Sequence, residues 1–327
     1  MITTPKGTLL AFCEGRLNSA SDTGDIDVLL RRSFDGGKTW AAVQKLADMG
    51  DDTIGNPTPV FERKTGTIFL LMTRNPGKTT EKEIVGATAH DSRTVWIARS
   101  RDDGATWTAP TEITAQTKRP EWTWYATGPG NGIQLRTGRL VIPCDHNRRD
   151  DKSRHSHIIY SDDRGETWKI GAVAADQTNE SAVAELKDGS LLLNMRSYAG
   201  KNRRAIQRST DGGLTLGPLT LDEALIEPVC QASLVSALPA GKKSDNRLLF
   251  SNPAATTRTR MTVRLSRDGG RTWPESRVIH EGPSAYSSLA VLRDKSVGLL
   301  YERGEKRPYE RITFARFPLS WLSNAAK

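Results

Sequence analysis

Cysteine is scarce in this chain of 327 residues, which contains only Cys13, Cys144 and Cys230. Three cysteines without metal-ligand spacing exclude a disulfide-stapled scaffold and a cysteine-rich metal site. Each lies in an apolar, strand-like stretch, so we expect all three to be buried thiols. No apolar run is long enough to span a membrane, and the first residues, MITTPKG, do not form a signal peptide.

Long amphipathic helical patterns, low-complexity stretches, charge blocks and linkers are also missing from the sequence. Without a linker to divide it, residues 1–327 are expected to form a single large β domain. The net charge of +9 would suit a nucleic-acid binder. However, the basic residues are scattered among Asp and Glu, and no basic tract contains interleaved aromatics. We therefore expect no nucleic-acid partner, and instead an arginine-lined pocket for an anionic substrate.

The chain does contain an internal repeat with the pattern S-x-D-x-G-x-T-W. Copies occupy 33–40, 100–107, 161–168 and 266–273, and a worn copy at 209–216 has Leu216 in place of Trp. Such repetition is typical of solenoids, propellers and arrays. Asp followed two residues later by Gly favours a tight turn, and an alternating strand-like run precedes each copy. Each copy is therefore predicted to be a structural hairpin turn whose Trp packs between neighbouring sheets.

Short apolar runs opened by turn or polar residues, such as GTIFLLMTR and GSLLLNMRS, recur about once per repeat. Together with the repeats they indicate roughly six sheets of short strands, which are best closed radially. The predicted fold class is all-β, and the predicted architecture is a six-bladed β-propeller.

The repeats resemble the Asp-boxes (BNR repeats) of the sialidase (neuraminidase) superfamily, six-bladed propellers that release terminal sialic acids. In that family the Asp-boxes lie on the face away from the active site. Other propellers also carry Asp-boxes, but three further stretches resemble sialidase motifs: residues 14–33, 179–198 and 282–292. The resemblance implies an exo-α-sialidase with no metal or organic cofactor.

Within EGRLNSASDTGDIDVLLRRS, residues 14–33, the resemblance implies a pocket arginine at Arg16 and the general acid/base at Asp22. Asp22 lies among small polar residues on a loop, from which a carboxyl can reach over a pocket and donate a proton. Without the resemblance, an Asx-turn or cap is the better interpretation. Asp25 is the nearest rival, and Asp27 falls inside the predicted strand.

Residues 179–198 resemble the sialidase segment with the catalytic Glu and a carboxylate-binding Arg, here Glu180 and Arg196. A hairpin that turns at KDG would bring both to one end. The alternative is a surface ion pair of little energetic value. Glu185 is the other candidate acid, but it lies nearer the turn.

GPSAYSSLAVL, residues 282–292, resembles the segment with the catalytic tyrosine, which makes Tyr286 the candidate nucleophile. A phenol with a pKa near 10 needs a base to attack at neutral pH, and Glu180 would be that base. Sialidases are an exception to the two-carboxylate scheme of glycosidases, since a carboxylate nucleophile would repel the substrate's own carboxylate. Taken alone, Tyr286 is equally a packed aromatic at a strand end. The family's further arginine falls on Arg258, and Arg260 would point the same way on an extended strand.

Sialidases also carry an Arg-Ile-Pro motif on their first strand, whose arginine helps to bind the substrate carboxylate. No Arg-Ile-Pro occurs in this sequence, so the expected propeller lacks the strand that carries it. Losing one partner of a buried charge pair costs about 2–5 kcal/mol, so substrate binding is expected to be weaker.

The sequence therefore predicts an exo-α-sialidase that hydrolyses sialylated glycans, glycoproteins or glycolipids with retention. The alternative is a sialidase-like, glycan-binding propeller with weak or no hydrolase activity, because the first arginine is missing. A related lyase or trans-glycosidase would share the same site. A further stretch, ATGPGNGIQL at 126–135, resembles a pocket edge and is given no role.

Overall fold

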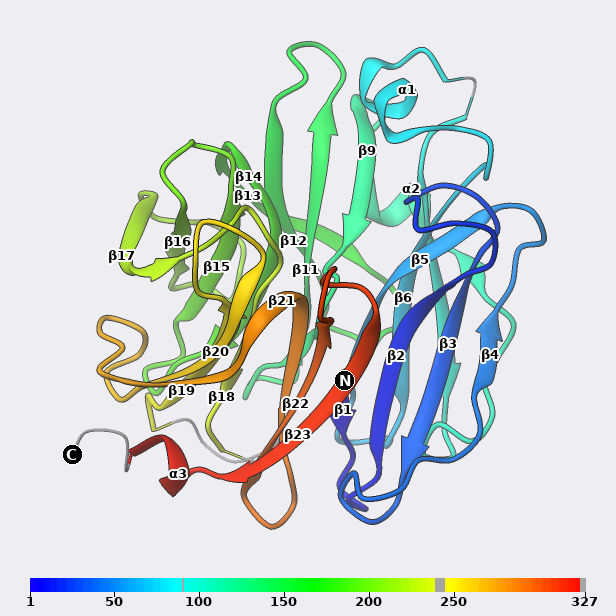
Figure 1. Ribbon diagram of the computed structural model, residues 1–327. Coiled ribbons are helices and arrows are strands. Elements are labelled where there is room, and N and C mark those ends of the chain that lie inside the picture. The colour runs from blue at the N-terminus through cyan, green and yellow to red at the C-terminus, as the bar shows by residue number, and fades with distance from the viewer. Residues whose placement is uncertain (90, 239–244, 324–327) are drawn as a thin grey trace.

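The computed structural model describes residues 1–89, 91–238 and 245–323, and these form 23 strands and three short helices (Figure 1). The helices are α1 (Glu81–Gly86), α2 (Thr114–Thr117) and α3 (Ser320–Ser323). The all-β prediction is confirmed. None of the helices in the described ranges has the length and apolar character needed to cross a membrane.

The strands pair into four hydrogen-bonded sheets. The first contains β1 (Ile2–Thr3), β2 (Leu9–Arg16), β3 (Ile26–Ser33), β4 (Gln44–Ala47), β5 (Thr53–Phe61), β6 (Ile68–Asn75), β7 (Thr94–Ser100) and β8 (Thr111–Glu112). The second contains β9 (Trp122–Thr127), β10 (Ile133–Gln134), β11 (Leu140–Arg148), β12 (Arg154–Ser161) and β13 (Lys169–Asp176). The third contains β14 (Thr178–Glu185), β15 (Leu191–Ser197), β16 (Arg203–Ser209) and β17 (Thr220–Ile226). The fourth contains β18 (Ser233–Ser236), β19 (Leu248–Pro253), β20 (Thr259–Ser266), β21 (Glu275–Val291), β22 (Ser296–Arg303) and β23 (Arg311–Pro318).

Two of these sheets each join two antiparallel groups. In the first sheet, one parallel pair, Ile26 with Thr53, links the β1–β4 group to the β5–β8 group. In the fourth sheet, the 17-residue strand β21 pairs with β20 along its first half and with β22 along its second half. Six antiparallel groups follow one another along the chain, in agreement with the roughly six sheets predicted. The strand pairing alone does not close them into a ring.

The Asp-box repeats form the predicted turns, as the copy at 161–168 shows. The Ser161 hydroxyl donates to Asp163 Oδ1 at 2.8 Å, and the Gly165 N–H donates to Ser161 Oγ at 2.7 Å. The Thr167 N–H also donates to Asp163 Oδ1, at 2.9 Å. The same carboxylate-centred network forms around Asp35, Asp102, Asp211 and Asp268. These aspartates therefore have the structural role that the sequence predicted.

The repeat tryptophans pack against neighbouring groups of strands, as predicted. The ring centroids are separated by 5.9 Å for Trp107 and Phe12, 6.4 Å for Trp168 and Phe69, and 5.4 Å for Trp40 and Phe314. The last pair joins the β1–β4 group to β23 at the other end of the chain. The apolar core is accordingly divided into clusters between successive groups of strands rather than gathered at one centre.

The cysteines only partly follow the prediction. Cys144 and Cys230 are buried free thiols, but Cys13 is half-buried and lines a cavity. Successive side chains of a strand point to opposite faces. Because Phe12 packs into the core, the next residue on β2, Cys13, points to the other face and is less buried than the other two cysteines.

Candidate active site

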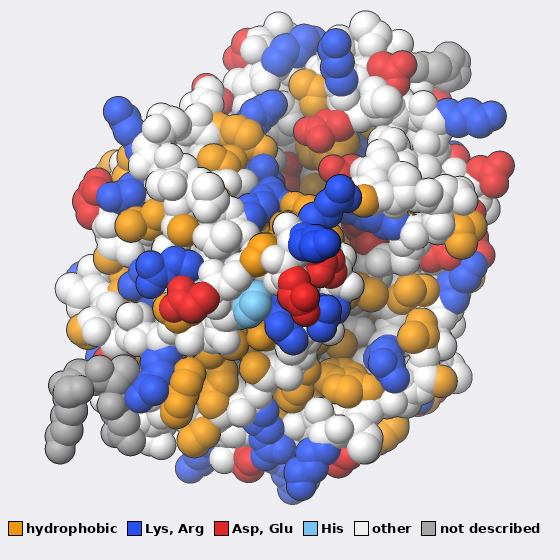
Figure 2. All heavy atoms as spheres, in the orientation of Figure 1, with side chains coloured by type: hydrophobic (Ala, Val, Ile, Leu, Met, Phe, Trp, Pro, Cys, Tyr) orange, Lys and Arg blue, Asp and Glu red, His pale blue; other side chains and the backbone are white. Residues whose placement is uncertain are grey.

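A cavity of about 790 Å³ opens where strands of several groups end, and Figure 2 shows it as a hollow with acidic and basic side chains around it. All six predicted site residues line this cavity: Arg16, Asp22, Glu180, Arg196, Arg258 and Tyr286. None of the residues of the five repeats, all of them described, lines it. The strand directions explain the separation, because β3 begins beside the Asp22 loop and ends roughly 25 Å away at the first repeat.

Three candidate residues form one buried cluster. The Tyr286 hydroxyl donates to Glu180 Oε1, and Arg196 Nη1 donates to Glu180 Oε2 at 2.7 Å. Arg196 Nη1 also lies 3.5 Å from Tyr286 Oη. The β14–β15 hairpin supplies Glu180 and Arg196 from its open end, as the sequence predicted, and β21 supplies Tyr286.

Burial sets the protonation of this cluster. Burial, followed by the charge of Glu180, raises the pKa of Tyr286 well above its usual value. Burial disfavours the charged form of Arg196, but Glu180 and then Tyr286 outweigh it and raise the pKa of Arg196. The phenol is therefore protonated, and Glu180 is the group positioned to accept its proton.

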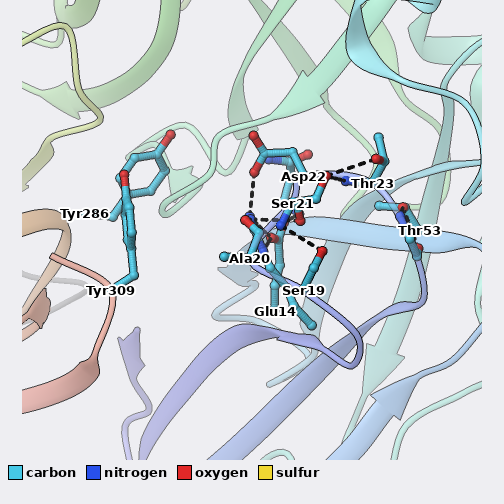
Figure 3. Close-up of polar contacts among 12 residues, drawn as sticks. Glu14, Ser19, Ala20, Ser21, Asp22, Thr23, Thr53, Tyr286 and Tyr309 are labelled. Atoms are coloured by element: carbon cyan, nitrogen blue, oxygen red, sulfur yellow. Dashed lines mark hydrogen bonds and ion pairs between the residues drawn. The ribbon is translucent and has the colours of Figure 1, made fainter. Parts of the chain in front are cut away.

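The Asp22 loop lies across the cavity from the cluster. In Figure 3, Asp22 and Ser21 lie on one side, and Tyr286 and Tyr309 stand together on the other. Arg16 Nη2 lies 2.8 Å from Asp22 Oδ1 and 2.7 Å from Glu14 Oε2, so Arg16 ties the loop to β2. The Asp22 side chain is 69% exposed. Donating a proton requires Asp22 to leave its ion pair with Arg16, and its exposure permits that movement.

The rival acids are placed elsewhere. Asp25 and Asp27 do not line the cavity, and Asp27 pairs with Lys45 at 2.8 Å. Glu185 lies at the turn end of the β14–β15 hairpin, where it pairs with Arg136 at 3.3 Å.

Arg258 reaches the cavity, but Arg260 does not. The Arg258 guanidinium lies 5.7 Å from the ring centre of Tyr286, and its Nη1 donates to the Tyr309 hydroxyl. The expectation that Arg260 points the same way is wrong. Its φ of 63° takes it out of extended backbone, and its side chain pairs with Glu281 at 3.5 Å, outside the cavity.

Several lining residues were not predicted from the sequence: Glu14, Arg93, Trp124, Asp145, Glu302 and Tyr309. Asp145 is 1% exposed, and burial, then the charge of Glu180, raises its pKa. Burial likewise raises the pKa of Glu302, whose Oε2 accepts the Tyr286 N–H at 3.0 Å. The stretch at 126–135, given no role above, contributes Ala126, Pro129 and Gly130 to the wall. Among the described residues, no group of three or more His, Cys, Asp or Glu is arranged to hold a metal ion.

Comparison with known proteins agrees with this arrangement. Residues 7–301 match the family model of the BNR repeat-like domain, so the chain is a BNR-repeat protein. A sialidase of Micromonospora viridifaciens is 36% identical over 98% of this chain, and an exo-alpha-sialidase of Arthroderma benhamiae is 32% identical over 99%. The solved structure of the Hadza microbial sialidase Hz136 is 36% identical, covers 98% of this chain and 65% of its own, and superimposes with a TM-score of 0.87.

The chain belongs to the sialidase (neuraminidase) superfamily. It spans 50% of the length of the Micromonospora relative, 59% of a Bacteroides fragilis sialidase that is also 36% identical, and 83% of the Arthroderma relative. An intramolecular trans-sialidase from Ruminococcus gnavus, 18% identical with a TM-score of 0.82, shares the fold.

Proposed function

We propose that this chain is an exo-α-sialidase that hydrolyses terminal sialic acids from glycans, glycoproteins or glycolipids with retention of configuration. The observation that carries this proposal is the Tyr286–Glu180 hydrogen bond in a cavity lined by Arg196 and Arg258. The relatives named as sialidases, at 32% to 36% identity, support the same activity.

In the proposed reaction, Tyr286 Oη bonds to the anomeric carbon and its proton passes to Glu180. Asp22 gives its proton to the leaving glycosidic oxygen as that bond breaks. Asp22, now ionised, takes a proton from water, and the water oxygen displaces Tyr286 from the sugar. Tyr286 then recovers its proton from Glu180. Two displacements at one carbon give net retention.

The arginines would bind the substrate carboxylate. Arg196 reaches the cavity from β15 and Arg258 from the residue just before β20, and Arg16 lies beside Asp22. A neutral phenol as the nucleophile suits this anionic substrate, because it adds no negative charge near the carboxylate.

We further propose that the six antiparallel groups are the blades of one closed propeller formed by residues 1–327. Contacts between the two ends of the chain support closure: Trp40 packs on Phe314, and Arg316 Nη1 donates to the Gly36 carbonyl at 3.2 Å. The high TM-score against a sialidase structure supports the same architecture.

Proton NMR of sialoside turnover tests the reaction and its stereochemistry together. We expect the α-anomer of free sialic acid to appear first and to mutarotate later. The β-anomer as first product would contradict retention, and an anhydro or unsaturated product would indicate trans-glycosidase or lyase chemistry. Binding without turnover would favour the glycan-binding alternative. Tyr286→Phe, which keeps the ring but has no nucleophilic oxygen, is the matched inactive control.

A further inference from the structure

The two arginines nearest Tyr286 have different partners. Arg196 is paired with the Glu180 carboxylate at 2.7 Å. Arg258 forms no ion pair with any residue in the described ranges, and its Nη1 donates instead to the hydroxyl of Tyr309. Arg258 is half-buried and lines the same cavity.

The Arg258 guanidinium lies near two tyrosine rings. Its central carbon is 5.7 Å from the ring centre of Tyr286 and 5.9 Å from that of Tyr309. Figure 3 shows the two tyrosines side by side; Tyr286 lies on β21 and Tyr309 in the connection between β22 and β23. Aromatic faces attract a cation without carrying a formal charge. The phenol oxygen likewise accepts a hydrogen bond while remaining neutral.

A neutral partner has a different effect from a carboxylate partner. A carboxylate would orient the guanidinium but would also cancel its charge and compete with an anionic ligand. A phenol orients the guanidinium without adding a negative charge that would cancel it. The Arg258–Tyr309 contact is exposed to solvent, with Tyr309 54% exposed, so water partly screens the attraction between this charge and an anion in the cavity.

The loop that carries Tyr309 is held in place by hydrogen bonds that do not involve the Tyr309 hydroxyl. The Glu310 carboxylate accepts the backbone N–H groups of Glu305 at 3.0 Å, Lys306 at 3.0 Å and Arg307 at 2.8 Å. Removing only the Tyr309 hydroxyl therefore leaves the loop held by Glu310, so its effect on Arg258 can be measured separately.

We propose that Tyr309 is a positioning residue that holds Arg258 in place as an uncancelled cation for the carboxylate of the substrate. The inference rests on the proposed function, because it takes the ligand to be a sialic acid. Tyr309 acts through Arg258 and makes no bond to the reacting carbon.

The test compares sialic acid with its neutral methyl ester, with dissociation constants measured by ligand-observed NMR. In Tyr309→Phe, affinity for the acid should fall about tenfold, as expected for loss of one hydrogen bond to a charged group. Affinity for the ester should not change. In sialoside hydrolysis KM should rise while kcat stays within about threefold, because the interaction serves binding rather than the chemical step. Tyr160→Phe is the matched control, since that ring also packs on an arginine, Arg139, at 4.2 Å but lies outside the cavity.

Tyr309→Glu tests the charge argument directly. It supplies an acceptor that also cancels the charge of Arg258, so the acid should bind more weakly than to Tyr309→Phe. Equal loss of acid and ester binding in Tyr309→Phe, or no loss of either, would overturn the inference. The inference would also be overturned if Tyr309→Glu bound the acid as tightly as the wild type does. If the wild-type chain bound the acid but hydrolysed no sialoside, the proposed function would be wrong. The comparison of acid and ester binding would still decide the role of Tyr309.

Discussion

Two buried histidines should make this protein lose stability in mild acid. His146 on β11 and His157 on β12 are 1% and 0% exposed, and their Nδ1 atoms are 3.0 Å apart. A single Nδ1–H can bridge the two nitrogens only while at least one ring is neutral, because two protonated rings would point two donors at each other. Burial, followed by the charge of Arg119, lowers the pKa of His157 to about 3. Burial and then His157 lower the pKa of His146.

The direction of the stability change follows from the numbers of protons bound by the folded and the unfolded chain. The unfolded chain takes up protons at both histidines as the pH falls through about 6.5, and the folded chain does not, so stability is lost on acidification. Each histidine contributes about 1 kcal/mol of loss between about pH 6.5 and 5.5, or about 2 kcal/mol for the pair. Asp145 and Glu302 act in the opposite direction, because their raised pKa values let the folded state keep protons that the unfolded state releases.

The assay must therefore compare how strongly the unfolding free energy depends on pH in the wild type and in histidine variants. Urea unfolding at pH 6.5 and pH 5.5 is measured for the wild type and for a His146→Asn, His157→Asn double variant, whose amides replace the Nδ1 contact. The decrease in unfolding free energy should be about 2 kcal/mol larger in the wild type. Either single variant should remove about half of that difference, which keeps the test available if the double variant does not fold. Equal decreases in wild type and variants would refute the reasoning.

Three further predictions concern the site and the repeats. Asp22→Ala should slow hydrolysis of sialosides with poor leaving groups far more than that of activated aryl sialosides, since only the former need a proton donor; equal losses in kcat/KM would reject Asp22 as the acid. Glu180→Gln should lower kcat by about 10²–10⁴-fold without raising KM, because Arg196 is freed to bind the anion; unchanged kcat in steady-state kinetics would mean that Tyr286 needs no such base. Gly165→Ala should lower the unfolding free energy by about 2–4 kcal/mol, since Gly165 has φ 87° and a Cβ there would lie 2.4 Å from the Phe69 ring. Gly138→Ala, with φ 99° and open space around it, should cost only about 1 kcal/mol, and equal costs in urea unfolding would contradict the packing argument.

Features built from neighbouring residues could be predicted from the sequence. Each Asp-box closes on itself through bonds that span at most four residues, so its pattern contains the whole turn. The Glu180–Arg196 contact follows from one hairpin, whose turn and strand lengths can be read directly. Asp22 needed the family resemblance, because a loop aspartate has many structural uses.

Features that depend on assembly between distant strands could not be predicted. Asp145 sits in an apolar run, and only pairing of β11 with its neighbours and packing against β14 brings it near Glu180. Tyr309 meets Arg258 across 51 residues, and nothing in either segment indicates the other. The predicted direction of the Arg260 side chain was wrong because the prediction assumed strict alternation along an extended strand. The backbone leaves the extended conformation at Arg260, and the residue type alone did not indicate this.

The buried cluster also settles what kind of ion pair joins Glu180 to Arg196. A surface pair would contribute little, but these side chains are only 9% and 14% exposed, so both charges have lost much of their hydration. The Tyr286 hydroxyl donates to the same carboxylate, so Glu180, Arg196 and Tyr286 form one hydrogen-bonded cluster. In the proposed reaction, a substrate carboxylate that binds Arg196 competes with Glu180 for that charge. Glu180 then has fewer competing partners at the moment when Tyr286 must give up its proton, so the same arginine would link substrate binding to activation of the nucleophile.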